Sequence, residues 1–457
     1  MKILKNLSYS VLAFSLLASS CGKKIDIEPQ DDISSENALS SAADVNNVLV
    51  GAYTVLAHPA LYGTNLVMIP DLYASPSYLN WTGTFSTYRD ISNQNLISTN
   101  EDATRTWTRA YQAINAANTV LESLDVVTDP DMKNELQGKA LFIRGIMHFE
   151  LVRLYGLPYE AGAANSSLGV PIALKAVKAF EDITSDVPRN TVAEVYTQAE
   201  KDLTEAVSLL SDSPDLYAAK GMLARLYLQK SDFTKARIQA NDIIESGEYS
   251  LASNLEDPFR VKNSSEGVFE IQQNEQSNAG SSNDGLATFY SSYLNNTGGK
   301  VGRGDLSILS SYVNSYAATD KRRTQMIYEG TGAKTGWFTR KWYNYFDNIP
   351  VVRLTELYLT RAECNARLGG SLGASPLSDI NELRQRAGLA ALTSVTVNDI
   401  LAERDKELAF EGYRIHDLKR TKRNVGTLAY NAPKLVFPIP YREVSVNSKL
   451  VQNPGYN

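Results

Sequence analysis

Apolar residues recur at helical spacing through the middle of the chain, and this pattern constrains the fold more than any other feature. In one stretch the spacing is i, i+4, i+7, i+11 and i+14, as on one face of a helix, and is held by Trp107, Tyr111, Ile114, Asn118 and Leu121. Similar stripes predict helices over about 36–56, 136–155, 190–210, 216–227 and 236–244. The fold class is therefore predicted to be mainly α.

Two neighbouring helices carry the spacing of a tetratricopeptide repeat. Small and apolar residues stand at the required offsets, namely Leu223, Ala224, Tyr227 and Ala236. Small residues at these offsets let two antiparallel helices approach closely, and each pair needs a neighbour to bury its outer face. Residues 353–368 and 377–387 repeat the pattern around a glycine-rich turn. About four degenerate pairs would build a curved, tetratricopeptide-like scaffold.

Two long segments, residues 57–100 and 250–350, interrupt the helical pattern. Both are rich in Ser, Thr, Asn and Gly, and their aromatic residues follow neither a helical nor a strand period. Loops of this length in a compact protein are usually functional or disordered. Their many large aromatics argue against disorder. We predict long irregular insertions that face a ligand.

The N-terminus has the layout of a bacterial lipoprotein signal. Two lysines precede a short apolar run, and Ser19 and Ser20 then lead into Cys21. The run is too short to span a bilayer, which needs about 20 apolar residues. We predict that residues 1–20 are a signal peptide, that acylated Cys21 is the lipid anchor, that 21–35 form a tether and that 36–457 form one domain. The alternative is an ordinary secretory peptide with an incidental cysteine.

Composition narrows the possible partners. The formal net charge of −6 argues against nucleic acid and against an electrostatic membrane-binding face. Cys364 is the only other cysteine, so no disulfide framework is expected, and with three histidines a structural zinc site is not expected either. No cofactor is indicated. A calcium ion held by loop carboxylates stays open.

The C-terminal part resembles a known family. The stretch Ile400-Leu-Ala-Glu-Arg-Asp-Lys-Glu-Leu-Ala-Phe-Glu-Gly-Tyr-Arg-Ile-His-Asp-Leu-Lys-Arg420 is similar to the hallmark helix of the SusD/RagB family, and residues 437–456 are similar to its closing motif. Matches earlier in the chain follow in the expected order: Trp107 with Tyr111, Phe142 with Arg144, Pro188-Arg189, and Asn381-Glu-Leu-Arg-Gln-Arg-Ala-Gly388.

This resemblance implies a SusD-like fold and a nutrient-binding lipoprotein of the outer membrane that faces the cell exterior. It implies an oligosaccharide ligand, a SusC-like TonB-dependent transporter as partner in glycan uptake, and no catalysis. Lys23 and Lys24 stand where the family's surface-export signal tends to be acidic. Retention on the periplasmic side therefore remains an alternative.

Three carboxylates in the hallmark stretch invite a catalytic interpretation. Glu403, Glu407 and Glu411 stand at i, i+4 and i+8, as paired carboxylates for acid–base work or a metal cluster would. We favour a structural interpretation, because nearby cations lie at pairing distance along the helix, namely Arg404, Lys406 and Arg414. The glycine-rich run 298–304 lacks the Walker spacing. No catalytic residue is predicted.

Sugar recognition needs exposed aromatic plates flanked by polar side chains. The first insertion supplies this mixture among small neighbours that would present it, and the candidates are Asp71, Tyr73, Tyr78, Asn80, Trp81, Tyr88 and Arg89, with Phe85 nearby. The family resemblance also implies contacts in the second insertion, with candidates Asn283, Asp284, Tyr290 and Trp337, and with Phe289 nearby. The alternative is that these aromatics pack the loops onto the helices. Trp342 is predicted to be a core residue.

Other functions stay open at this point. A peptide-binding, RagB-like import component would differ only in its ligand. A surface glycoside hydrolase would use Glu403 and Glu407. A pure scaffold would bind a protein in its helical groove and nothing small in its loops.

Overall fold

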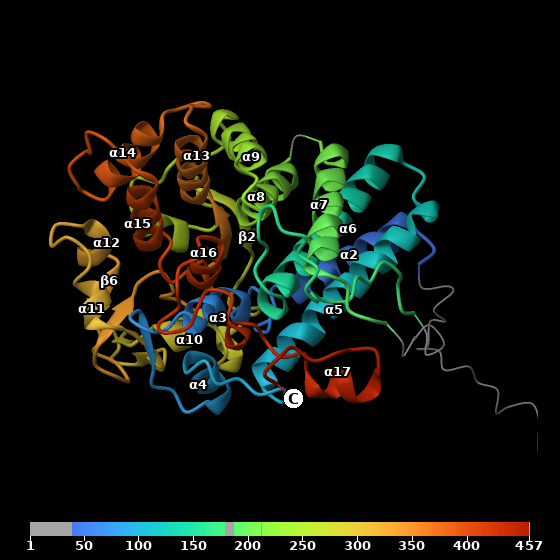
Figure 1. Ribbon diagram of the computed structural model, residues 1–457, viewed down its shortest axis with the longest axis horizontal. Helices are drawn as coiled ribbons and strands as arrows, with labels where there is room; N and C mark the ends of the chain where they lie inside the picture. The colour runs from blue at the N-terminus through green and yellow to red at the C-terminus, as the bar shows by residue number, and fades with distance from the viewer. Residues whose placement is uncertain (1–38, 179–186, 212, 457) are drawn as a thin grey trace, which may run out of the picture.

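The computed structural model describes residues 39–178, 187–211 and 213–456, and it is mainly helical (Figure 1). The predicted signal peptide 1–20, Cys21 and the tether 21–35 lie outside these residues. No helix in the described part of the chain is both long and apolar enough to cross a membrane.

Long helices that pack against one another in order along the chain form the scaffold. They are α2 (Ala42–Leu56), α5 (Glu101–Glu122), α6 (Pro130–Tyr155), α7 (Val192–Leu209), α8 (Pro214–Gln229), α9 (Phe233–Glu245), α13 (Leu354–Leu368) and α14 (Pro376–Arg386). Side-chain caps begin many of them. Thr191, for example, forms a capping box with Glu194 at the start of α7, and Ser213 precedes a proline at the first position of α8.

The tetratricopeptide-like pairing is confirmed. Helices α8 and α9 pack together, and all four repeat-type residues, Leu223, Ala224, Tyr227 and Ala236, are buried. Helix α13 packs against both α9 and α14, which extends the series of pairs. The Arg144 guanidinium lies 2.7 Å from Asp202 and donates to Asn118 Oδ1 at 3.0 Å.

The two insertions contain more regular structure than the sequence predicted. The first holds α3 (Asn65–Tyr73), β1 (Leu79–Trp81) and α4 (Ser86–Ser92). The second holds β2 (Gly267–Ile271), α10 (Leu286–Tyr290), β3 (Tyr293–Leu294), β4 (Lys300–Val301), β5 (Leu306–Ile308), α11 (Ser310–Val313), α12 (Lys321–Thr324), β6 (Ile327–Glu329) and β7 (Trp337–Thr339). All of these strands except β2 have only two or three residues, which is too short to show an alternating pattern.

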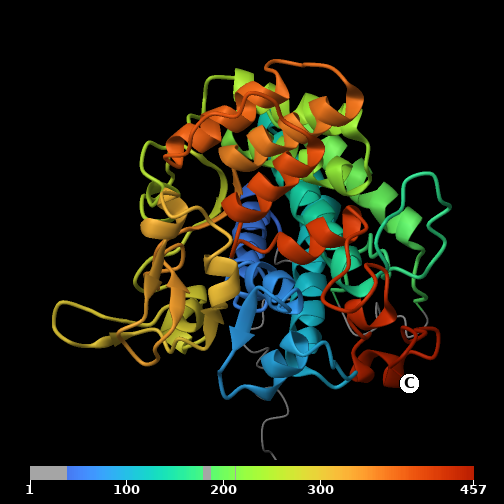
Figure 2. The ribbon, with the colours of Figure 1, turned by 60° about the vertical axis from the view of Figure 1, so that its left-hand side comes forward.

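One small sheet joins the two insertions. Its strand order is β1-β5-β7-β6, and β1 pairs antiparallel with β5 so that Leu79 lies opposite Ile308. The second insertion is tied to the scaffold by β2, which pairs with β8 (Ile349–Arg353) just before α13. The short hairpin of β3 and β4 projects from the body (Figure 2). Residues separated by more than 200 positions in the chain are therefore neighbours in one sheet.

The C-terminal part packs against α3 and the end of α6. It contains α15 (Val397–Glu407), α16 (Arg414–Arg420) and α17 (Tyr441–Val446). The Phe437 N–H donates to the Leu154 carbonyl at 2.8 Å, and the Tyr441 N–H donates to the Ser98 carbonyl at 2.8 Å. The family-like closing motif thus packs against the first third of the chain.

Candidate ligand-binding surface

Several candidate residues of the first insertion are buried, so the prediction that their small neighbours expose them is wrong. Tyr73, Tyr78 and Asp71 are 1%, 0% and 0% exposed. The Tyr78 ring stacks on Phe410 at 5.3 Å, and its hydroxyl accepts the Phe410 N–H at 2.6 Å. Tyr73 donates its hydroxyl to a carbonyl of the C-terminal segment. These rings hold α3 and β1 against that segment, a partner that the local sequence does not reveal.

Asp71 is bound by backbone groups of the C-terminal part of the chain. Its carboxylate accepts the Gly412 N–H at 2.9 Å and the Arg414 N–H at 3.2 Å. Burial outweighs these hydrogen bonds and raises the pKa of Asp71 to about 7. Tyr290, a candidate from the second insertion, lies on α10, is 0% exposed, and has its ring 6.4 Å from that of Phe410. None of these side chains offers surface to a ligand in this structure.

The remaining aromatics of the first insertion form a cluster that reaches the surface. Trp81 lies 5.1 Å from Tyr88 and 5.8 Å from Phe289, and Phe85 lies 6.3 Å from Phe289, measured between ring centroids. Trp81 and Tyr88 are buried, whereas Phe85 is 43% exposed. Phe85 is therefore an exposed aromatic ring held by two others, Tyr88 at 6.2 Å and Phe289 at 6.3 Å between centroids.

An arginine from the second insertion covers part of this cluster. The Arg303 guanidinium lies 4.7 Å above the Phe85 ring and 5.4 Å from Phe289, and its Nε donates to Asp305 at 2.8 Å. Lys334 Nζ lies 3.2 Å from the other oxygen of Asp305. We call Phe85, Trp81, Phe289, Arg303, Asp305 and Lys334 the Phe85 surface.

The glycine-rich run that lacked the Walker spacing positions Arg303. Gly302 and Gly304 flank it with φ angles of +69° and +63°, which favour glycine. A Cβ on Gly302 would lie 2.2 Å from the Ser291 carbonyl oxygen, so no other residue fits there. The Arg303 N–H donates to the Thr288 carbonyl at 2.7 Å. Sequence reasoning missed Arg303, and the two glycines around it were the only available signal.

A polar network borders the cluster. Arg105 on α5 donates to Tyr88 at 2.6 Å, to Asp284 at 3.2 Å and to Asp102 at 2.6 Å. Tyr88 in turn donates to Asn65 at 2.8 Å. Asp284, a predicted ligand residue, is thus part of an ion pair and remains partly exposed.

The other candidates lie at or near the surface. Asn80, Arg89 and Asn283 are exposed, and Trp337 on β7 is half-buried. Arg89 donates to the carbonyls of Gly83 and Thr84 at 3.2 and 3.4 Å, which places it beside the Phe85 surface. Contact of these residues with a ligand stays a prediction. Trp342 is 4% exposed, and its indole N–H donates to the Phe410 carbonyl, which confirms it as a core residue.

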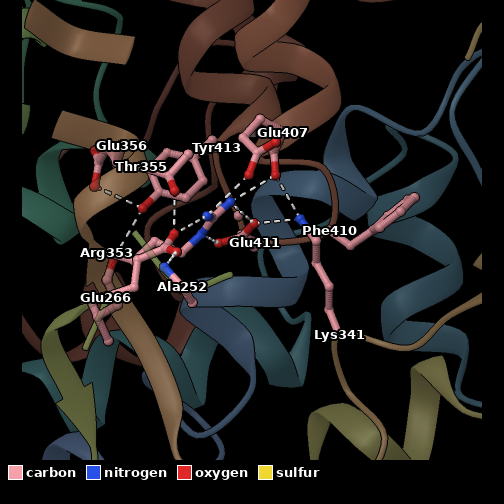
Figure 3. A network of polar contacts seen from close by, with 12 residues as sticks. Ala252, Glu266, Lys341, Arg353, Thr355, Glu356, Glu407, Phe410, Glu411 and Tyr413 are labelled. Atoms are coloured by element: carbon pink, nitrogen blue, oxygen red, sulfur yellow. Dashed lines mark hydrogen bonds and ion pairs between the residues drawn. The ribbon is translucent and has the colours of Figure 1, made fainter. Parts of the chain in front are cut away.

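The glutamates of the hallmark stretch lie in a buried ionic network (Figure 3). Arg353 donates to Glu411 at 2.7 Å, to Glu266 at 2.7 Å and to Glu407 at 3.3 Å. Lys341 also binds Glu411, at 2.6 Å. We call Arg353, Glu266, Glu407, Glu411 and Lys341 the Arg353 network.

The partners in this network differ from those predicted along the helix. Glu407 pairs with arginines from other elements, namely Arg322, Arg353 and Arg386, and Glu403 pairs with Arg322 and Arg384. Arg404 instead pairs with Asp417 at 2.9 Å, and Arg414 pairs with Asp405. These cations hold the pKa of Glu407 well below its usual range despite its burial. A carboxyl group that stays ionised at neutral pH is unsuited to act as a general acid.

Within the described ranges, no group of three or more His, Cys, Asp or Glu side chains is arranged to hold a metal ion.

Fold and site together define a helical, tetratricopeptide-like protein that presents one aromatic and arginine-bearing loop surface. Two family models match it. One, described as "Starch-binding associating with outer membrane", matches residues 25–228, and the other, described as "SusD family", matches residues 330–433. The chain belongs to the SusD/RagB family.

Individual proteins and solved structures that are similar to this chain carry SusD names as well. A SusD-like protein of Formosa agariphila is 25% identical and covers 98% of this chain and 99% of its own length. The starch-binding protein SusD of Bacteroides thetaiotaomicron is 32% identical over 28% of this chain and 27% of its own. The crystal structure of a SusD superfamily protein from Bacteroides vulgatus has a TM-score of 0.79 at 26% identity and covers 91% of this chain and 99% of that one.

Proposed function

We propose that this protein binds an oligosaccharide at the Phe85 surface and delivers it to a SusC-like TonB-dependent transporter for uptake. The observation that carries the proposal is Phe85 itself. It is 43% exposed, the rings of Tyr88 and Phe289 lie 6.2 and 6.3 Å from it between centroids, and the Arg303 guanidinium lies over it. A rigid ring offers a flat apolar plate to the C–H face of a sugar. Arg303, Lys334 and Asn80 supply hydrogen-bond partners for the surrounding hydroxyl groups.

Membership of a family whose model is described as starch-binding and associated with the outer membrane supports this function. In the proposal, acylated Cys21 anchors the protein in the outer membrane, facing the cell exterior. The protein acts as a lid on the transporter and performs no chemistry. The engagement of Glu403, Glu407 and Glu411 by buried cations supports a purely binding role.

The direct test is calorimetric titration of purified residues 22–457 with oligosaccharide and peptide panels, followed by analysis of the products. We expect saturable binding to one class of oligosaccharide and no turnover. Phe85→Ala should weaken binding about tenfold, because losing roughly 55 Å² of buried apolar contact at about 25 cal/mol per Å² removes about 1.4 kcal/mol. Tyr441→Ala is the matched control, since Tyr441 is 60% exposed but lies on α17.

Other outcomes distinguish the alternatives. Binding of peptides only would favour a peptide-import role. Turnover that Glu407→Gln abolishes would favour a glycoside hydrolase. Deleting the partner transporter in the native cell should abolish uptake of the ligand, while the isolated domain still binds it. Retained uptake would contradict the lid role.

A further inference from the structure

A groove on the scaffold shares no residue with the Phe85 surface. It has a volume of about 650 Å³ and runs between the second half of α2, the start of α8 and strand β2. Val50 on α2 and Pro214 on α8 lie on its walls, and residues 263–272 supply most of its remaining lining. A volume of this size is typical of binding sites.

The charged residues that line this groove are all acidic. They are Asp215, Glu248 and Glu270, and no lysine or arginine is among the lining residues. Asp215 has a cation nearby, because Lys139 Nζ lies 3.2 Å from its carboxylate. Glu270 accepts the Asn263 N–H at 2.9 Å and the Asn348 amide at 2.8 Å, but it forms no ion pair with a described residue. The groove therefore has an excess of negative charge.

Glu270 is the most informative of the three. It is only partly exposed, and burial raises its pKa because no cation compensates the charge. A cation brought in by a ligand would remove this cost. Aromatic rings also line the groove, at Tyr53, Tyr249 and Phe269, and aromatic faces attract ammonium and guanidinium groups. Charge and rings together favour a cationic ligand.

The shape of the groove indicates an extended ligand. Every residue from Gly267 to Gln272 lines it. Side chains of consecutive strand residues point to opposite faces, so lining by all six residues places the strand backbone along the groove. Among the described strands, β2 pairs with β8 alone, in a two-stranded sheet. Its other edge can accept a further strand, which is how several domains bind extended peptides.

We propose that this groove binds an extended peptide segment bearing lysine or arginine side chains, which adds to the open edge of β2. The backbone of the segment would bond to β2. Its cationic side chains would reach Glu270 and Glu248, and the rings would flank them. This site is independent of the oligosaccharide site, so either can fail alone.

The test uses three dye-labelled octapeptides, (Thr-Lys)₄, (Thr-Gln)₄ and (Thr-Glu)₄, titrated with residues 22–457 and followed by fluorescence anisotropy. We expect (Thr-Lys)₄ to bind at least tenfold more tightly than (Thr-Gln)₄, with (Thr-Glu)₄ weaker still. Methylating alternate backbone nitrogens of (Thr-Lys)₄ should weaken binding at least tenfold, because it removes the donors that pair with β2. Equal binding of the lysine and glutamine peptides, or no loss on methylation, would overturn the proposal.

Substitutions in the groove test whether the peptide binds there. Glu270→Gln and Glu248→Gln should each weaken (Thr-Lys)₄ binding about fivefold, and Val50→Trp, at a residue that is 55% exposed on the groove wall, should abolish it. Glu382→Gln is the control, since Glu382 is exposed on α14 outside the groove. An unchanged unfolding midpoint of Val50→Trp separates steric blocking from misfolding. Binding that survives in the folded Val50→Trp variant would overturn the proposal.

Discussion

The Arg353 network and the Phe85 surface are built from the same kinds of residue, and burial makes them different. In the network, Arg353 is 2% exposed and three carboxylates surround it, with Phe259 against its guanidinium at 5.6 Å. At the surface, Arg303 lies over a ring that is 43% exposed and shares one carboxylate with Lys334. A buried arginine holds elements together, whereas a half-exposed arginine on a ring is available to a ligand.

Removing the central cation of the network should have the largest effect. Arg353→Met would leave Glu266, Glu407 and Glu411 without their shared partner. We expect the free energy of unfolding to fall by about 3–5 kcal/mol, because breaking a buried ion pair leaves an uncompensated charge. Urea unfolding measures this. Lys235→Met is the control, since Lys235 is half-exposed and paired at the surface, and it should change stability by less than about 1 kcal/mol. Equal effects of the two variants would contradict the comparison.

Burial of Asp71 should make the stability of the protein depend on pH. Its pKa is about 7 in the folded protein and 3.8 as a free group, so the folded state holds the proton to higher pH. The free energy of unfolding of the wild type should therefore fall as pH rises from about 4 to 7, by up to about 1.4 kcal/mol per pH unit. Asp71→Asn cannot titrate and should gain stability relative to the wild type over that window. Urea unfolding at pH 5 and pH 8 measures the difference. The same difference at both pH values would count against the burial of Asp71.

Tyr78 and Phe85 lie seven positions apart in one insertion, but their substitution should have opposite effects. Changing Tyr78 should lower stability, whereas changing Phe85 should lower oligosaccharide affinity. Tyr78→Phe leaves the buried Phe410 N–H without its acceptor, so we expect a loss of about 1–3 kcal/mol in stability and no change in oligosaccharide affinity. Calorimetry and urea unfolding on the same preparation measure both. Weaker binding with unchanged stability would instead restore the ligand role that the sequence predicted for Tyr78.

The smallest effect is expected at Arg303. Arg303→Gln keeps a hydrogen-bonding side chain but removes the charge over Phe85. We expect oligosaccharide affinity to fall about three- to fivefold, which corresponds to roughly 0.7–1 kcal/mol. Stability should change little, because the guanidinium is partly exposed. An unchanged affinity would contradict the proposed contact between Arg303 and the ligand.

The sequence by itself determined the helical scaffold and the family. Helical spacing is a local property that repeats over many turns, so residues such as Trp107, Tyr111 and Leu121 predict their helix without knowledge of what it packs against. Family-like motifs from Trp107 to the closing residues are equally local. Nearby cations in the same stretch led to the structural interpretation of Glu403, Glu407 and Glu411, but the structure pairs these glutamates with cations of other elements, such as Arg322 and Arg353.

Tertiary structure decided which loop aromatics are exposed and which charges meet. Tyr78 is buried because Phe410, more than 300 residues later, stacks on it, whereas Phe85 stays 43% exposed although Arg303 lies over its ring. Glu407 meets Arg353, which precedes α13, and Arg386 on α14 because α13 packs against both α15 and α14, not because of helical spacing. Burial and long-range pairing depend on the whole chain at once, and for that reason no short stretch of sequence reveals them.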